Sequence, residues 1–243
     1  MSQVIRVLVI DDSAFARKVI REMLSRNPYI EVVGTARDGV EALEMAEQLN
    51  PDVVTCDLMM PRLDGVAFVR QQMQRNPLPI LILSVAPQDA EQALAALEAG
   101  AVDFVQKPTA LATDELLHIR EELIEKVKAA AGAPVERLRV EEPPPVAVPE
   151  ATPRAPGRID AIVIGVSTGG PQALRHLVPQ FPADFPVPIA IVLHMPVGFT
   201  ALYAEKLNES SLLTVKEAAE GDEMRPGFAL LARGASHRLR LLP

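Results

Sequence analysis

The stretch VIRVLVIDDS (residues 4–13) places a run of aliphatic side chains directly before two aspartates. Such a run predicts a strand covered on both faces, as in parallel sheets, because a solvated face would need alternating polar residues. Similar runs recur, each separated by a stretch with helical apolar spacing. We predict strands at 4–10, 30–36, 52–57, 79–84 and 101–107, and helices at 14–26, 39–49, 64–75, 88–99 and 113–130. This alternation predicts a doubly wound parallel α/β sheet.

A proline-rich stretch divides the chain, since residues 134–156 hold seven prolines without apolar periodicity. Such a composition favours extended, solvated backbone and predicts a linker. We therefore expect a first domain at 1–125, a linker at 126–158 and a second domain at 159–243. Alternation continues in the second domain, with strands expected at 159–166, 188–194, 212–218 and 228–233 and helices at 171–178 and 199–210. It predicts a second parallel α/β sheet.

The overall composition restricts the function classes. The 243-residue chain has a net charge of −8, which argues against nucleic-acid binding, because contact with phosphates needs clustered Lys and Arg. No apolar run is long enough to insert into a membrane. A single cysteine, Cys56, excludes an internal disulfide and fits a reducing compartment. We expect a cytoplasmic protein.

Polar side chains close the otherwise apolar strands of the first domain. Asp11 and Asp12 follow the first strand, and Asp57, Ser84 and Lys107 end the third, fourth and fifth. The carboxyl ends of parallel strands share one edge, so these groups are expected to meet there.

Three neighbouring carboxylates repel one another unless a cation shares their charge, and oxygen ligands suit Mg²⁺. We therefore predict a magnesium site at which Asp57 accepts a phosphoryl group, with Lys107 balancing charge. Ser84 is expected to bind a phosphoryl oxygen, and Phe104 to repack behind it. The less specific reading is a set of helix-capping aspartates.

This domain resembles the receiver domain of two-component response regulators. The resemblance rests on LVIDDS (8–13), VVTCDLMMP (53–61), LILS (81–84) and FVQKP (104–108). It implies phosphorylation of Asp57 by a partner histidine kinase. It also implies that Asp12, Asp57 and the Met59 carbonyl hold Mg²⁺ and that Lys107 relays the signal.

The stretch VIGVSTGGP (163–171) presents Ser167 in a glycine-rich turn between a strand and a helix. Its spacing fits the G-x-S-x-G elbow of serine nucleophiles, with the N–H of Thr168, beside Gly169, as an oxyanion donor. A structural turn or a phosphate cradle are the alternatives. The next strand ends at His194, which a parallel sheet would bring beside Ser167 as a general base.

The other histidines compete weakly with His194 for this role. We interpret His118 and His176 as solvated helix residues, whereas His237 lies in a basic tail that could approach the serine.

The second domain resembles the catalytic domain of chemotaxis-type protein-glutamate methylesterases, through IGVSTGGP (164–171), LHMPVGFT (193–200) and EAAEGDEMRPG (217–227). The resemblance implies cofactor-free hydrolysis of γ-glutamyl methyl esters on chemoreceptors, and deamidation of receptor glutamines. Ser167 would attack, His194 would carry the proton, and a later aspartate would orient the imidazole. The receiver is expected to cover the serine until Asp57 is phosphorylated.

That aspartate has no match here, because Asp160, Asp184 and Asp222 fit no triad position, and ARGASHRLRLLP (232–243) departs from the family pattern. We therefore expect a C-terminally truncated, incomplete catalytic domain. One alternative is a non-catalytic phosphate sink or docking protein. Another is an α/β-hydrolase acting on small esters, which the order of the residues disfavours.

Overall fold

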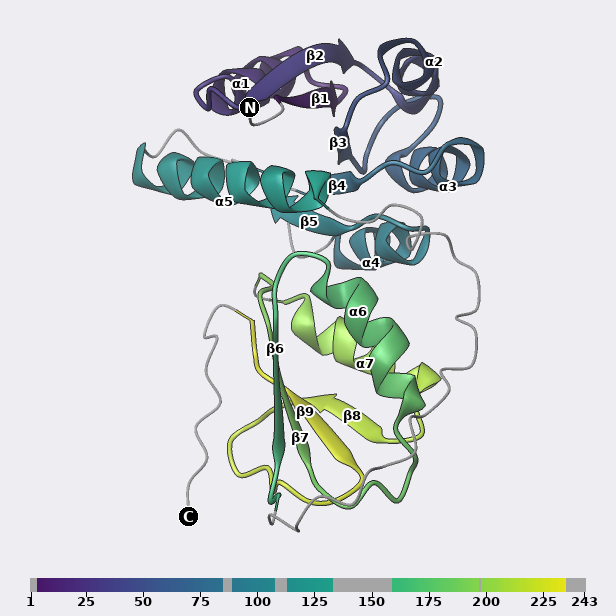
Figure 1. The fold of residues 1–243 in the computed structure, drawn as a ribbon, viewed down its shortest axis with the longest axis vertical. Coiled ribbons are helices and arrows are strands. Elements are labelled where there is room, and N and C mark those ends of the chain that lie inside the picture. The colour runs from purple at the N-terminus through teal and green to yellow at the C-terminus, as the bar shows by residue number, and fades with distance from the viewer. Residues whose placement is uncertain (1–3, 85–88, 108–112, 133–158, 197, 235–243) are drawn as a thin grey trace. The chain divides into compact units, whose positions relative to one another are not determined.

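The computed structural model describes residues 4–84, 89–107, 113–132, 159–196 and 198–234. The chain forms two compact units, Met1–Val140 and Glu141–Pro243. Each unit is built on its own sheet (Figure 1).

The sheet of the first unit has five strands in the order β2-β1-β3-β4-β5, with every neighbouring pair parallel. The strands are β1 (Ile5–Ile10), β2 (Ile30–Ala36), β3 (Val53–Asp57), β4 (Ile80–Ser84) and β5 (Asp103–Gln106). Residues 53–57 are buried throughout, as expected for a central strand covered on both faces. The strand order reverses between β1 and β3, and ligands of such sheets bind at this point.

Helices cover both faces of this sheet. They are α1 (Ala14–Leu24), α2 (Gly39–Leu49), α3 (Gly65–Arg75), α4 (Ala90–Glu98) and α5 (Thr113–Ala131). Figure 1 shows α1 and α5 on one face and α2, α3 and α4 on the other. The main apolar cluster joins α1 and α5 to β1, β3, β4 and β5.

The helix boundaries follow local signals in the sequence. Asp38 caps α2 by accepting hydrogen bonds from the N–H groups of Val40 and Glu41. The Glu41 side chain accepts from the Arg37 N–H, one residue before the cap, which makes a variant of the capping box. Asn50 ends α2 in the left-handed region, at φ 44°.

Helix α5 continues to Ala131, in agreement with the helix expected at 113–130, and it overlaps residues 126–131 of the expected linker. Val127 and Ala130 are fully buried in the apolar cluster. Lys126 is buried as well, and its ammonium bonds to the Phe104 carbonyl (2.7 Å) and pairs with Asp103 (3.3 Å). The last turns of α5 therefore belong to the core of the first unit.

The second unit contains a four-stranded parallel sheet in the order β6-β7-β9-β8. Its elements are β6 (Ile162–Val166), α6 (Gly170–Leu177), the 3₁₀ turn η3 (Val178–Gln180), β7 (Ile189–Leu193), α7 (Thr200–Ser210), β8 (Thr214–Glu217) and β9 (Phe228–Leu231). Helices α6 and α7 lie on the same face (Figure 1), as right-handed crossovers in one direction along a sheet require. The predicted fold class, two parallel α/β units, is confirmed.

Candidate functional site

Three carboxylates meet at the carboxyl edge of the first sheet. Asp11, Asp12 and Asp57 each offer an oxygen, and these oxygens lie within 4.8 Å of one another. Asp11 and Asp57 are buried, at 0 % and 5 % exposed, whereas Asp12 is exposed. The end of β1 and the end of β3 are neighbours in the sheet, and this register brings the residues together.

Lys107 lies within the cluster, with its Nζ 2.7 Å from Asp11 Oδ2 and 2.7 Å from Asp57 Oδ1. Burial alone would lower the pKa of Lys107, but its bonds to the two carboxylates outweigh burial and raise it. Burial is also the main cause that raises the pKa of Asp57, opposed by Lys107 and reinforced by Asp11. One ammonium cannot balance three carboxylates, so the oxygen-rich donor set fits a divalent cation.

The remaining predicted residues of this site are Met59, Ser84 and Phe104. The Met59 N–H donates to Asp57 Oδ1 at 3.4 Å, and its side chain is 58 % exposed. Ser84 ends β4, although its side chain lies outside the described part of the chain. Phe104 on β5 is buried. Cys56 is fully buried, and burial strongly raises the pKa of its thiol.

Two residues that the sequence analysis did not identify also shape this site. Arg17 on α1 donates to the carbonyls of Asp11 (2.6 Å) and Asp12 (3.0 Å) and so holds the end of β1. At Gly65, a Cβ atom would lie 2.2 Å from the Asp57 carbonyl oxygen, so only glycine fits behind the acceptor. A glycine directly after the Asp64 cap was the only available signal.

The second sheet places Ser167 beside His194. Val166 pairs with Leu193 in the parallel register, so the next residues on the two strands are neighbours. The His194 N–H donates to the Val166 carbonyl at 3.1 Å. Ser167 Oγ lies 3.5 Å from His194 Nδ1, and both residues are exposed.

The glycines around Ser167 shape the turn. Gly169 has φ 75°, in the left-handed region that favours glycine, and caps α6. A Cβ at Gly170 would lie 2.9 Å from side-chain atoms of Val166 and Leu193, so the turn packs closely on both strands. The Gly170 N–H donates to the Ser167 carbonyl at 2.7 Å. This geometry is a sharp strand-to-helix turn that projects the serine.

The competing residues lie elsewhere. His118 on α5 and His176 on α6 are exposed, and His237 lies outside the described residues. Asp222 accepts hydrogen bonds from Lys216 (2.6 Å) and from the Ala219 N–H (2.8 Å), and the Lys216 bond lowers its pKa.

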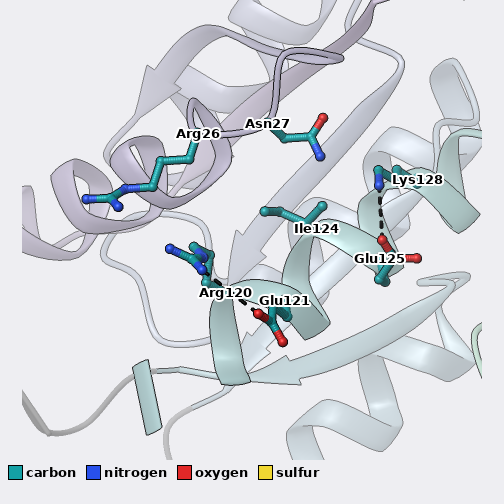
Figure 2. Close-up of a pocket in the computed structure, with 7 residues that line it drawn as sticks. All are labelled: Arg26, Asn27, Arg120, Glu121, Ile124, Glu125 and Lys128. Atoms are coloured by element: carbon teal, nitrogen blue, oxygen red, sulfur yellow. Dashed lines mark hydrogen bonds and ion pairs between the residues drawn. The ribbon is translucent and has the colours of Figure 1, made fainter. Parts of the chain in front are cut away.

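The first unit also has a surface pocket (Figure 2). Its lining comes from the end of α1 and from α5: Arg26, Asn27, Arg120, Glu121, Ile124, Glu125 and Lys128. Because α1 runs antiparallel to β1, its last turn is at the opposite edge of the sheet from Asp11. Two of the carboxylates are paired, Glu121 with Arg120 and Glu125 with Lys128. None of the three clustered aspartates lines this pocket.

Comparison with known proteins supports the division into two units. Residues 7–119 match the response regulator receiver domain, and residues 162–240 match the CheB methylesterase domain. A "Protein-glutamate methylesterase/protein-glutamine glutaminase 5" of Myxococcus xanthus is 50 % identical over 237 residues, which cover 96 % of this chain and 67 % of that protein. This chain belongs to the protein-glutamate methylesterase family.

Other members show the same relation. A methylesterase/glutaminase of Halalkalibacterium halodurans is 46 % identical over 98 % of this chain and 68 % of its own length, so the chain spans about two thirds of these family members. The first unit is similar to the response regulator domain of Thermotoga maritima CheB, with a TM-score of 0.50 and 39 % identity over 54 % of this chain and 98 % of that domain. None of the helices in the described part of this methylesterase-family chain has the length and apolar character to cross a bilayer.

Proposed function

We propose that the chain is a phosphorylation-regulated protein-glutamate methylesterase and glutamine deamidase that acts on methyl-accepting chemoreceptors in the cytoplasm. The observation that carries the proposal is the Ser167–His194 pair, 3.5 Å apart at an exposed sheet edge. The names of the relatives give the same two activities.

In this mechanism Ser167 Oγ attacks the γ-acyl carbon of a methylated glutamate while His194 takes the hydroxyl proton. The separation of 3.5 Å is longer than proton transfer needs, and such contacts are often long until substrate binds. The oxyanion of the tetrahedral intermediate is stabilised by the N–H of Thr168, beside Gly169, at the start of α6.

The intermediate collapses as His194 returns the proton to the leaving group, which departs as methanol from an ester or as ammonia from a glutamine. Water, deprotonated by His194, then attacks the acyl-Ser167 ester. The bond between the acyl carbon and Ser167 Oγ breaks, His194 returns the proton to Oγ, and glutamate is released. The cycle needs no cofactor, since every proton passes through the imidazole.

The first unit supplies the regulation in this proposal. A partner histidine kinase donates the phosphoryl group, and Asp57 accepts it on a carboxylate oxygen. Asp11, Asp12, Asp57 and the Met59 carbonyl would hold Mg²⁺, which neutralises phosphoryl oxygens when bound. Lys107, already bonded to Asp57, would move to the phosphoryl group and relay the change, while Ser84 binds a phosphoryl oxygen and Phe104 repacks behind it.

The experiment measures methanol release from methylated receptor fragments by the full chain, with and without a small-molecule phosphodonor. We expect turnover that depends on Ser167 and His194 and that rises with phosphodonor only while Asp57 is present. His176→Ala, an exposed histidine on α6, is the matched control. Turnover that survives Ser167→Ala would refute the nucleophile. Phosphorylation of Asp57 without any turnover would instead indicate a phosphate sink or docking protein.

A further inference from the structure

One face of helix α7 carries two buried hydroxyl groups. Thr200 and Tyr203 are three residues apart, hence on the same side of the helix, and are 0 % and 5 % exposed. Ala204 and Leu207, also buried, complete this face of the helix. A buried hydroxyl needs a hydrogen-bond partner, so the partners show what the face holds in place.

The Thr200 hydroxyl bridges two segments at the carboxyl edge of the sheet. It donates to Glu217 at the end of β8 and accepts from the Gly234 N–H, beyond β9, at 3.0 Å. A carboxylate only accepts and an N–H only donates, so both roles of the hydroxyl are used. Serine in place of Thr200 keeps the hydroxyl and can make both hydrogen bonds, whereas valine, of similar shape, can make neither.

Gly234 in turn supports the chain that follows His194. A Cβ on Gly234 would lie 2.5 Å from the Pro196 carbonyl oxygen and 3.0 Å from the Met195 carbonyl oxygen, so the two backbones are in close contact. Thr200 is therefore linked, through Gly234, to the backbone of the two residues that directly follow His194.

The second hydroxyl supports the serine turn. Tyr203 Oη donates to the Pro171 carbonyl at 2.6 Å, within the first turn of α6 and four residues after Ser167. Burial raises the pKa of Tyr203, so the phenol keeps the proton that it donates. The His194 N–H bond to Val166 already joins the two strands. The approach of the Ser167 and His194 side chains then depends on the turn after Ser167 and on the segment after His194, both of which are linked to α7.

We propose that α7 sets the relative position of Ser167 and His194, and that Thr200 and Tyr203 are positioning residues for the esterase reaction. The claim that these residues support catalysis rests on the proposed function. The claim that they position the His194 side chain does not rest on it. Neither hydroxyl touches the reacting atoms.

The test uses two measurements on the full chain. The first is the rate at which a fluorophosphonate labels Ser167, as a function of pH. The second is the NMR titration of the His194 imidazole, which needs no substrate and no reactive serine; the signal is assigned among four histidines with His194→Ala. The variants are Thr200→Val, Thr200→Ser and Tyr203→Phe. Leu207→Ala, one turn further along α7, is a control that loosens the helix without removing a hydroxyl.

We expect Thr200→Val and Tyr203→Phe to slow labelling about tenfold, because small misplacements in a reacting pair are costly. Both variants should also shift the NMR titration curve of His194 along the pH axis. Below their melting temperatures, Thr200→Ser and Leu207→Ala should match the parent in labelling rate and in this curve. Parent-like labelling and titration in Thr200→Val and Tyr203→Phe would overturn the inference. So would an equal loss in Leu207→Ala. If the parent chain is not labelled, the proposed nucleophile fails, and the His194 titration alone decides the positioning.

Discussion

Each candidate site lies at the carboxyl edge of its own parallel sheet, but the two sites are held in different ways. In the first unit, Asp11 and Asp57 are buried and each lies 2.7 Å from the Lys107 ammonium. In the second, Ser167 and His194 are exposed and are placed by strand register and a glycine turn. Buried charge fixes the first site, whereas backbone geometry fixes the second. Changes in the first site should therefore affect stability, and changes in the second should affect chemistry.

The largest effect is expected at the exposed site. Ser167→Ala or His194→Ala should lower methyl-ester turnover by roughly 10⁴-fold or more, and the double variant little further, because the two groups act as one unit. The free energy of unfolding should change by less than about 0.5 kcal/mol, since both side chains are exposed. Methanol release and urea unfolding measure the two quantities. A marked loss of stability would remove the contrast between the sites.

The buried site should respond in the opposite way. Lys107→Met leaves Asp11 and Asp57 without their ammonium partner, and removing one partner of a buried pair costs about 3–5 kcal/mol. We expect this loss of unfolding free energy in chelator-treated protein, with partial recovery on adding Mg²⁺. Lys18→Met is the control, because its pair with Glu22 is exposed and is worth less than about 1 kcal/mol. Similar unfolding curves for the two variants would contradict buried charge as the stabilising feature.

Two glycines near the sites sharpen the contrast. Gly65→Ala pushes a methyl group to 2.2 Å from the Asp57 carbonyl oxygen, so the backbone must shift, at a cost of up to about 3 kcal/mol. Gly165→Ala, two residues before Ser167, meets nothing within 4 Å and should be close to neutral. Phosphodonor labelling of Asp57 and thermal unfolding would compare them. Equal effects would show that packing behind Asp57 is looser than the structure indicates.

A second buried charge in the first unit predicts a pH dependence. Burial raises the pKa of Asp103 to about 6 from an ordinary 3.8, despite Lys126 nearby. The folded state then binds a proton that the unfolded state has released, so this residue's contribution favours folding most near pH 4 and falls as the pH rises to 6. The loss is about 2 kcal/mol between pH 4.5 and 7, and Asp103→Asn should abolish it. Parallel pH profiles for the parent and this variant in urea unfolding would refute the shift.

The sequence predicted most of the fold because its signals are local. Runs such as residues 4–10 and 79–84 are mostly apolar and led to the prediction of buried parallel strands, which are β1 and β4. Asp38 and Asn50 marked the ends of α2 for equally local reasons. The helix expected at 113–130 agrees with α5, although the burial of its Val127 and Ala130 depends on an apolar cluster made by distant strands. The bounds of the linker stay a prediction.

The sequence also predicted which residues would share each edge, since residues that end parallel strands must meet. It therefore selected Asp11, Asp57 and Lys107 in one unit, and Ser167 and His194 in the other, although their roles remain predictions. It missed Arg17 and Gly65, whose parts follow from hydrogen bonds and close contacts rather than from residue type.

The sequence by itself determined the strand–helix alternation, the two parallel sheets and the polar groups at their carboxyl edges, because these follow from side-chain periodicity and chain direction. The tertiary structure alone decided which charges became buried pairs, as Lys126 on α5 shows by pairing with Asp103 on β5 at 3.3 Å. It also assigned the buried hydroxyls of Thr200 and Tyr203 to segments beyond β9 and in α6. The physical reason is that desolvation and hydrogen-bond partners depend on packing between segments that the local sequence does not specify.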